Sequence, residues 1–275
     1  METTEHSLSN IDGQEIIKRQ LDGYLATETL WKGTDLAGLK QLEFEHRTHS
    51  INIEKPEKRL GKRAEQFFIE LIKKTRECKL VSQNIQLKSG KITIGEIDCI
   101  LKKEDDFYHV EHVYKFYLYD QTEGTNELDY WIGPNRKDCL NFKLDKLKNK
   151  QLPILQTDQG IQVLKDLNIP PDKVQQYVHF RAQLFTPKTK HVQFKAINPT
   201  AIAGYYYRLD ELPTNYAYFL PCKLNWLLKP YENVEWKTFK EGVSEIKLLL
   251  SAQKSPMCWL KSNSGELEKC FVVWW

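Results

Sequence analysis

The chain has 275 residues, of which 41% are hydrophobic and 12% aromatic, so it can bury one large core or two small ones. Its 40 basic and 37 acidic side chains leave a net charge of +3, which excludes a polybasic tail and allows a local basic surface. The six cysteines include no CxxC pair, and no signal peptide or apolar run of about 18 residues is present, so we expect a cytoplasmic protein without disulfides, zinc or membrane contact.

The first segment, residues 1–56, is expected to be a helical extension. Residues 1–12 have the composition of a disordered terminus, whereas apolar residues recur at roughly helical spacing from Gln14 to Phe44. A break near Trp31–Gly33 divides that stretch into two predicted helices. Residues 45–57 are polar and include a proline, which is typical of a linker.

The second segment, residues 57–155, begins with the clearest helical pattern in the sequence. Apolar residues from Leu60 to Cys78 form one stripe at helical spacing, and basic residues collect in the last turns, where the helix dipole favours them. Glu65 precedes Phe68 by three residues, so it projects from the apolar face toward whatever the helix packs on. An ordinary flanking glutamate is the alternative interpretation.

Three strands are predicted after this helix, at Lys79–Leu87, Ile92–Leu101 and Tyr108–Tyr119. The strands are rich in β-branched and aromatic residues, and turn or charged residues at 88–90 and 102–106 separate them. The second and third strands therefore form a β-hairpin.

Acidic side chains lie on both strands of this hairpin. Alternation along a strand places Glu96 and Asp98 on one face of the first strand, and Glu111 and Lys115 on one face of the second. Two carboxylates about 4 Å apart repel by roughly 4 kcal/mol at an effective dielectric near 20, so a divalent cation normally accompanies such a cluster. We therefore expect a magnesium site, with the solvated face of an antiparallel sheet as the alternative.

A basic helix is predicted after the hairpin, from Asn135 as its N-cap to about Lys150. One face is apolar, and basic side chains lie on the other face or close to it: Lys143, Lys146, Lys150 and Arg136. These four residues are the candidate nucleic-acid contacts, because a basic helix beside a carboxylate cluster can bind phosphates. A solvated helix face is the alternative.

The third segment, residues 156–275, is predicted to be an α+β extension rich in aromatic residues. A short helix is expected at Ile161–Leu167, followed by strands at Tyr177–Phe185 and His191–Ala196. Tyrosines and arginines such as those in Tyr205–Arg208 either stack on bases or fill a core, and we expect the core.

A helix with an inward glutamate, a strand carrying GEID and a strand carrying Glu and Lys follow one another in this order. In this the chain resembles the PD-(D/E)XK nuclease superfamily, and the runs LGKRAEQFF, GEIDCIL, HVEHVYKFYL and WIGPNRKDCLNFKLDKL look like a bacterial domain-of-unknown-function family assigned to it. The resemblance covers about residues 57–155 well and the C-terminal half more loosely. It implies a restriction-endonuclease-like core: an α/β (α+β) fold with a mixed central sheet flanked by helices.

The resemblance also implies roles for particular residues. Asp98 and Glu111 would bind Mg²⁺ or Mn²⁺ directly, and Glu65 would hold the ion through water. Lys115 would orient the attacking water and stabilise the pentavalent phosphate, and Glu96 would be an accessory acid. This agrees with the preference of magnesium for oxygen ligands and retained waters.

The superfamily pattern places its lysine two residues after the second acid, where this chain has Val113, whereas Lys115 follows Glu111 by four. The extra distance is about 6.6 Å at roughly 3.3 Å per residue, which a lysine side chain can span. His112 would offer its backbone carbonyl to the ion. We therefore expect a metal-dependent nuclease that hydrolyses phosphodiester bonds, with DNA as the expected substrate.

Two other functions fit the same residues. One is a catalytically inactive nucleic-acid-binding or scaffolding protein on a nuclease fold, and its motivation is the missing lysine at Val113. The other is a protein-binding module that uses the aromatic C-terminal half. Both DNA and RNA, and both exonuclease and endonuclease action, are compatible with the nuclease interpretation.

Overall fold

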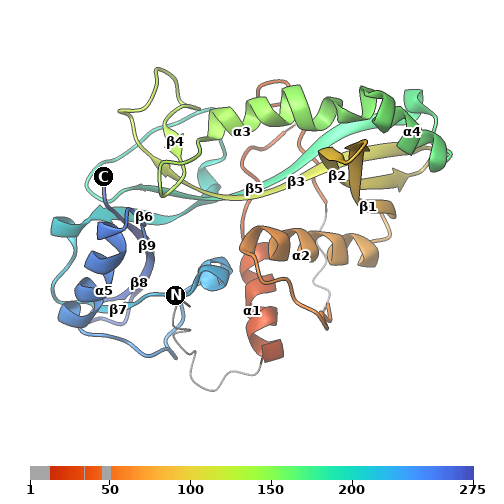
Figure 1. Cartoon of the computed structure of the whole chain (residues 1–275). Helices are drawn as coiled ribbons and strands as arrows, with labels where there is room; N and C mark the ends of the chain where they lie inside the picture. The colour runs from red at the N-terminus through yellow and green to blue at the C-terminus, as the bar shows by residue number, and fades with distance from the viewer. Residues whose placement is uncertain (1–12, 34, 45–50) are drawn as a thin grey trace.

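The structure is a computed structural model that describes residues 13–33, 35–44 and 51–275. Its centre is a nine-stranded sheet in the order β1-β2-β3-β5-β6-β9-β8-β7, with β4 paired to β3. Helices cover both faces of this sheet (Figure 1). The expected class, a mixed sheet flanked by helices, is thus confirmed. The predicted disordered terminus, and residues 45–50 of the predicted linker, lie outside the described residues.

The predicted helix and three strands of the second segment are confirmed with small shifts at their ends. They are α2 (Leu60–Lys74), β1 (Lys79–Ser89), β2 (Ile92–Lys103) and β3 (Asp106–Tyr119). The two hairpins that they form are antiparallel.

The sheet changes from antiparallel to parallel pairing at β3 and back again at β9. Strand β5 pairs in parallel with β3 over its whole central part, β6 with β5, and β9 with β6, whereas β8 and β7 complete the sheet by antiparallel pairing. Strands from the second and third segments therefore share one sheet. The bounds are β4 (Trp131–Ile132), β5 (Val174–Pro187), β6 (Ile202–Arg208), β7 (Ala217–Phe219), β8 (Met257–Lys261) and β9 (Leu267–Val273).

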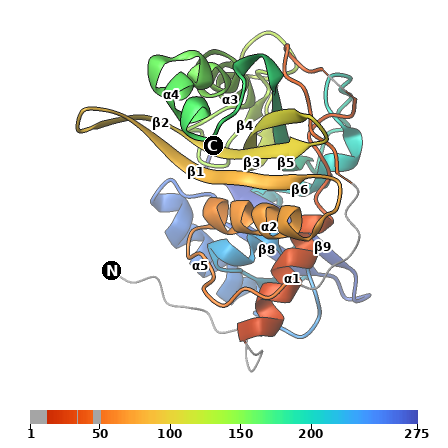
Figure 2. The same ribbon diagram turned by 90° about the vertical axis from the view of Figure 1, so that its right-hand side faces the viewer.

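Two helical layers enclose the part of the sheet around β3. On one face, α1 (Gly13–Leu25) and α2 pack on alternate side chains of β3 such as Val110 and Tyr114. The other face of β3, which includes Val113, is covered by a continuous helical run on the opposite side of the sheet (Figures 1 and 2). That run comprises α3 (Leu140–Lys146), the π-helical turn η1 (Leu147–Gln151), the 3-10 turn η2 (Leu152–Gln156) and α4 (Asp158–Asp166).

The prediction of a second helix in the first segment is wrong. Residues 36–39 form a tight turn, in which the N–H of Leu36 donates to Leu39 O at 3.1 Å and the N–H of Leu39 donates to Leu36 O at 2.9 Å. After this turn, the N–H of Leu42 donates to Val178 O at 2.8 Å. Strand β6 pairs with β5 only from Leu184 onward, so the edge of β5 before that residue is free to bond this segment. Backbone pairing at an open strand edge has outweighed the helical spacing of the apolar residues.

Two other local predictions are also wrong. The strand expected at His191–Ala196 is an irregular loop, in which the carboxylate of Glu127 accepts the N–H groups of Lys195 (2.7 Å) and Ala196 (2.8 Å). The basic helix begins at Leu140, and the side chain of Asn135 accepts the N–H of Ser255 at 2.8 Å instead of capping it.

The sequence analysis did not predict the bounds of the remaining elements of the third segment. They are the strands β6 to β9, the helix α5 (Phe239–Ser251), which packs on β7, and the short 3-10 turns η3 (Pro171–Lys173), η4 (Pro199–Ala201), η5 (Leu209–Glu211) and η6 (Lys223–Leu227). Throughout the described residues, every helix is too short or too polar to cross a membrane.

Candidate metal centre

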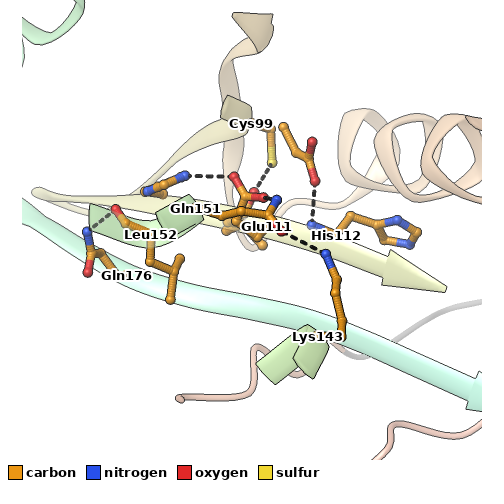
Figure 3. A network of polar contacts seen from close by, with 10 residues as sticks. Cys99, Glu111, His112, Lys143, Gln151, Leu152 and Gln176 are labelled. Carbon is orange, nitrogen blue, oxygen red and sulfur yellow. Dashed lines mark hydrogen bonds and ion pairs between the residues drawn. The ribbon is translucent and has the colours of Figure 1, made fainter. Parts of the chain in front are cut away.

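The candidate site lies where β2 and β3 separate. Their backbone pairing ends at Cys99 and Val110, whereas β1 and β2 remain paired as far as Ile92. The N–H of His112, two residues beyond the last pair, donates to the carboxylate of Asp98 at 2.9 Å (Figure 3). Asp98 thus takes the place of a backbone partner, and its side chain is held at the opening between the two strands.

Three carboxylates meet on the α2 side of this opening. One oxygen each from Glu65, Glu96 and Asp98 lie within 4.8 Å of one another. Glu65 projects inward from α2 and its side chain is only 12% exposed. The structure therefore brings together one acid from the helix and two from β2, whereas the sequence paired Asp98 with Glu111 as the direct ligands and made Glu96 an accessory acid.

Two polar side chains border these carboxylates. Lys62, one turn before Glu65 on α2, places its Nζ 2.9 Å from Glu65 Oε2 and 3.1 Å from Glu96 Oε1. The amide of Asn84 on β1 faces the same two acids, and with its nitrogen toward them it donates over 2.6 and 3.3 Å. The cluster is thus partly neutralised by the protein itself.

Glu111 approaches the same opening from the other face of the sheet. Its side chain is fully buried on β3, and the carboxylate accepts a hydrogen bond from Gln151 of η1 and lies 3.1 Å from His109 Nε2. Lys143 of α3 donates to Gln151 Oε1 at 2.7 Å, so the three side chains point toward one another (Figure 3). Glu111 is therefore adjacent to the cluster of three carboxylates and is not one of its members.

The electrostatics link the two faces. Burial, together with the negative charges of Glu111 and Glu65, raises the pKa of Asp98 to about 8. Burial lowers the pKa of Lys143 to about 8, against the attraction of Glu111. Burial likewise raises the pKa of Glu65, although Lys62 opposes the effect. Such perturbed groups in one place are typical of functional sites.

Lys115 does not turn toward the carboxylates. Its Nζ lies 2.6 Å from Asp138 Oδ2, near the loop that precedes α3. Val113, at the position where the superfamily pattern has its lysine, is buried against the α3 side of the core. The described lysines whose contacts connect them to the four acids are instead Lys62 and Lys143.

The four basic residues expected to contact nucleic acid do not form one surface. Lys146 and Lys150 are exposed, whereas Lys143 is directed inward. Arg136 is held by two acids, Asp120 at 2.8 Å and Glu123, and its guanidinium lies over the ring of Trp275.

Sequence reasoning missed the roles of Lys62, Asn84 and Gln151. Gln151 carried a signal, because it is a polar residue in line with the apolar stripe of the basic helix. Lys62 precedes Glu65 by the three residues that allow a helical ion pair. His109 also carried a signal, because it lies two residues before Glu111 and so shares its strand face; we expected an exposed histidine there, whereas it is buried against Glu111. Asn84 had no comparable signal, since its partners lie on other elements.

The donor atoms fit a hard divalent cation. Glu65, Glu96 and Asp98 offer carboxylate oxygens, and the cluster is open enough for an ion to keep several waters, since Glu96 is 34% exposed. No thiol or imidazole belongs to the cluster, which disfavours zinc.

Comparison with known proteins identifies a family for the chain but no described relative. A family model described as a domain of unknown function, DUF1853, matches residues 10–273. Neither the curated proteins nor the solved structures yield a match.

Proposed function

The chain belongs to the DUF1853 family. We propose that it is a metal-dependent nuclease that hydrolyses phosphodiester bonds of DNA. The observation that carries this proposal is the convergence of Glu65, Glu96 and Asp98 within 4.8 Å, where β2 leaves β3. The order of these elements, a helix with an inward acid followed by two acid-bearing strands, agrees with the resemblance to PD-(D/E)XK nucleases.

A cation would remove an electrostatic cost that the apo site carries. Glu65, Glu96 and Asp98 repel one another, and Lys62 contacts only the first two directly. At neutral pH without metal, Asp98 keeps a proton, because its pKa is about 8. We propose that Mg²⁺ or Mn²⁺ would replace this proton and would be held by Asp98, Glu65 and Glu96, next to the buried Glu111 that Gln151 and His109 hold in place.

The reaction is the attack of water on phosphorus. The new P–O bond forms as the bond to the leaving oxygen breaks, and the proton lost by water reaches that leaving oxygen through solvent. When bound, the metal polarises the phosphate and lowers the pKa of the attacking water. Glu111 is fully buried and accepts a hydrogen bond from Gln151, which in turn accepts one from Lys143, so we assign Glu111 the role of positioning these two side chains.

Lys143 is the cation that we assign to the phosphate. It extends from α3 toward Glu111, and its Nζ donates to the neutral amide of Gln151. Lys115, by contrast, is already paired with Asp138. A lysine without a carboxylate partner is the better placed to stabilise charge that develops on the phosphate.

A catalytically inactive nucleic-acid-binding protein is the second candidate. It is favoured by Val113 at the usual lysine position and by the ion pair that holds Lys115 away. Such a protein would bind nucleic acid in a salt-sensitive manner that does not depend on a chelator.

Cleavage assays separate these functions. Single-stranded, duplex and branched DNA and RNA are incubated with wild type and Asp98→Ala in Mg²⁺, Mn²⁺ or EDTA. We expect metal-dependent cleavage by wild type and a loss of at least about a hundredfold in Asp98→Ala. Glu235→Ala, which alters an exposed acid in the third segment, is the matched control.

Retained binding without cleavage by wild type would select the second candidate. Equal cleavage by wild type and Asp98→Ala, with both folded, would refute the site. A circular dichroism melt of each variant shows whether it is folded.

A further inference from the structure

We propose that the loop end of the β1–β2 hairpin, residues 88–94, is a nucleic-acid-binding arm that contacts the bases of the substrate next to the metal centre. The inference rests on the proposed function and deepens it. It assigns as substrate a nucleic acid with accessible bases near the scissile bond, such as a forked or frayed duplex.

The arm is a projecting element of the structure. All seven residues from Lys88 to Ile94 are exposed. In Figure 2 the hairpin that joins β1 to β2 extends beyond the rest of the molecule. It is long for its surroundings, because β2 pairs with β3 only from Cys99 onward, so the arm consists of β1 and β2 alone.

The chemistry of the arm combines apolar and basic side chains. Ile92 is 71% exposed and Ile94 is 44% exposed, and they are among the few large apolar side chains that face solvent. Lys88 and Lys91 lie beside them, and the chain from Lys79 to Gly95 contains no acidic residue. Lysines bind phosphates, and isoleucines on a projecting element insert between or stack against bases.

The arm leads directly to the carboxylates. Ile94 lies two residues before Glu96 on β2, about 6.6 Å away along the strand. It is the extra residue of a β-bulge, because Leu87 pairs with Gly95 and Lys88 with Thr93. Gly95 faces Ile154, since a Cβ there would meet Ile154 Cδ1 at 2.0 Å. A substrate phosphate at Glu96 and Asp98 would therefore bring the neighbouring nucleotides over Ile94 and toward the end of the arm.

Nucleic acid suits this surface better than a second copy of the chain. Strand β1 is the edge of the sheet, so strand-to-strand pairing between two chains is conceivable. Two antiparallel copies would, however, bring their lysines together with no acid on the arm to neutralise them. Phosphates supply that negative charge, and the adjacent candidate metal centre requires them.

The test measures binding without cleavage. Wild type, Ile92→Ala/Ile94→Ala and Lys88→Gln/Lys91→Gln are titrated in EDTA against a forked DNA with 2-aminopurine at the fork, and against the blunt duplex. We expect the isoleucine pair to abolish the wild-type change in 2-aminopurine fluorescence and to weaken fork binding by about tenfold. The lysine pair should reduce the slope of log K against log salt by about 1.8, since each phosphate contact contributes about 0.9.

The matched control alters an exposed apolar residue and an exposed lysine far from the arm. Lys247→Gln/Leu248→Ala on α5 fits this need, because Leu248 is 73% exposed and α5 lies at the other end of the sheet (Figure 1). This variant should bind both DNAs as wild type does.

The outcomes distinguish the arm from the proposed function. If both arm variants bind DNA as wild type does, the proposed role of the arm is wrong and the nuclease proposal is unaffected. Failure of wild type to bind any DNA at low salt would overturn both. A dimer seen by light scattering in wild type and lost in the isoleucine variant would overturn the arm in favour of a second copy.

Discussion

Two lysines on opposite faces of the sheet set the charge around the four acids. Lys62 contacts Glu65 and Glu96 directly, whereas Lys143 reaches Glu111 only through the amide of Gln151. A cation that is paired with acids in the resting site mainly offsets their repulsion. One that is bonded to a neutral amide can turn to a phosphate at a smaller cost.

Replacing the two candidate lysines tests this difference at the residue scale. We expect Lys143→Met to lower the single-turnover cleavage rate by about a hundredfold or more, because it removes a charge next to the developing negative phosphate. Lys115→Met should lower it by less than about tenfold, since its partner Asp138 lies outside the carboxylate cluster. Rates are measured at saturating protein and metal.

The affinity for Mn²⁺, measured by electron paramagnetic resonance, distinguishes a lysine that acts on the phosphate from one that acts on the metal ligands. It should change little in Lys143→Met if the residue acts on the phosphate and not on the metal ligands. The reverse ranking of the two variants would restore Lys115 to the catalytic role.

At the scale of elements, α1 joins the N-terminal part of the chain to the third segment. Gly23 on α1 lies against the backbone of η6, where an added Cβ would meet Leu227 O at 2.0 Å. The neighbouring side chains are also connected, since Gln20 Nε2 donates to Asn225 Oδ1 at 2.8 Å. Absence of a side chain at Gly23 therefore decides how closely these two elements approach.

One methyl group added at Gly23 should push α1 away from η6. We expect Gly23→Ala to reduce the free energy of unfolding by about 1–3 kcal/mol, because backbone atoms cannot yield as a flexible side chain can. Gly61→Ala is the matched control on α2, where nothing lies within 4 Å of the added Cβ. It should be neutral or stabilising by up to about 1 kcal/mol. Urea denaturation measures both, and equal effects would contradict the close-packing argument.

At the scale of the whole molecule, the sheet connects the candidate metal centre to overall stability. Strand β3 pairs with both β2 and β5, and β5 continues the sheet toward β9. Asp98 lies where the pairing of β2 with β3 ends, next to the central strands of this sheet. The proton on Asp98 is then linked to folding. The folded-state pKa, about 8, is above the ordinary value of 3.8, so the folded chain holds a proton that the unfolded chain releases between these values.

Stability without metal should therefore fall as pH rises from about 4 to 8, by at most about 1.4 kcal/mol per pH unit from this group. Asp98→Asn keeps an acceptor for the N–H of His112 and cannot ionise. In EDTA it should match wild type near pH 4 and be more stable above pH 8. Thermal melts at several pH values measure the difference, with Glu235→Gln as control.

Adding Mg²⁺ should reverse this order at pH 8. Wild type gains stability by binding the ion to its folded state only, whereas Asp98→Asn loses a ligand and gains less. Identical shifts of both melting curves with Mg²⁺ would contradict a metal site at Asp98.

Local patterns predicted the elements that surround the site. Periodicities along α2 and along strands β2 and β3 are strong, because each of these elements buries one face or both, so their bounds and their acids were recognisable. Strand β1 buries only Leu87 and was recognisable from its branched residues and the turn that follows it. The same reasoning mistook the stretch at Leu36–Leu42 for a helix. Its spacing fits a helix, but the open edge of β5 offered hydrogen bonds that no local pattern reveals.

By itself, the sequence determined the mixed α/β class, the order of helix and acid-bearing strands, and the acids Glu65, Glu96, Asp98 and Glu111 as candidates. Only the tertiary structure decided which of them meet and which lysine accompanies them. The reason is physical: the separation of β2 from β3 and the docking of α3 on the far face are contacts between distant parts of the chain. They turn Lys143 inward and leave Lys115 with Asp138, and neither orientation depends on spacing along the sequence.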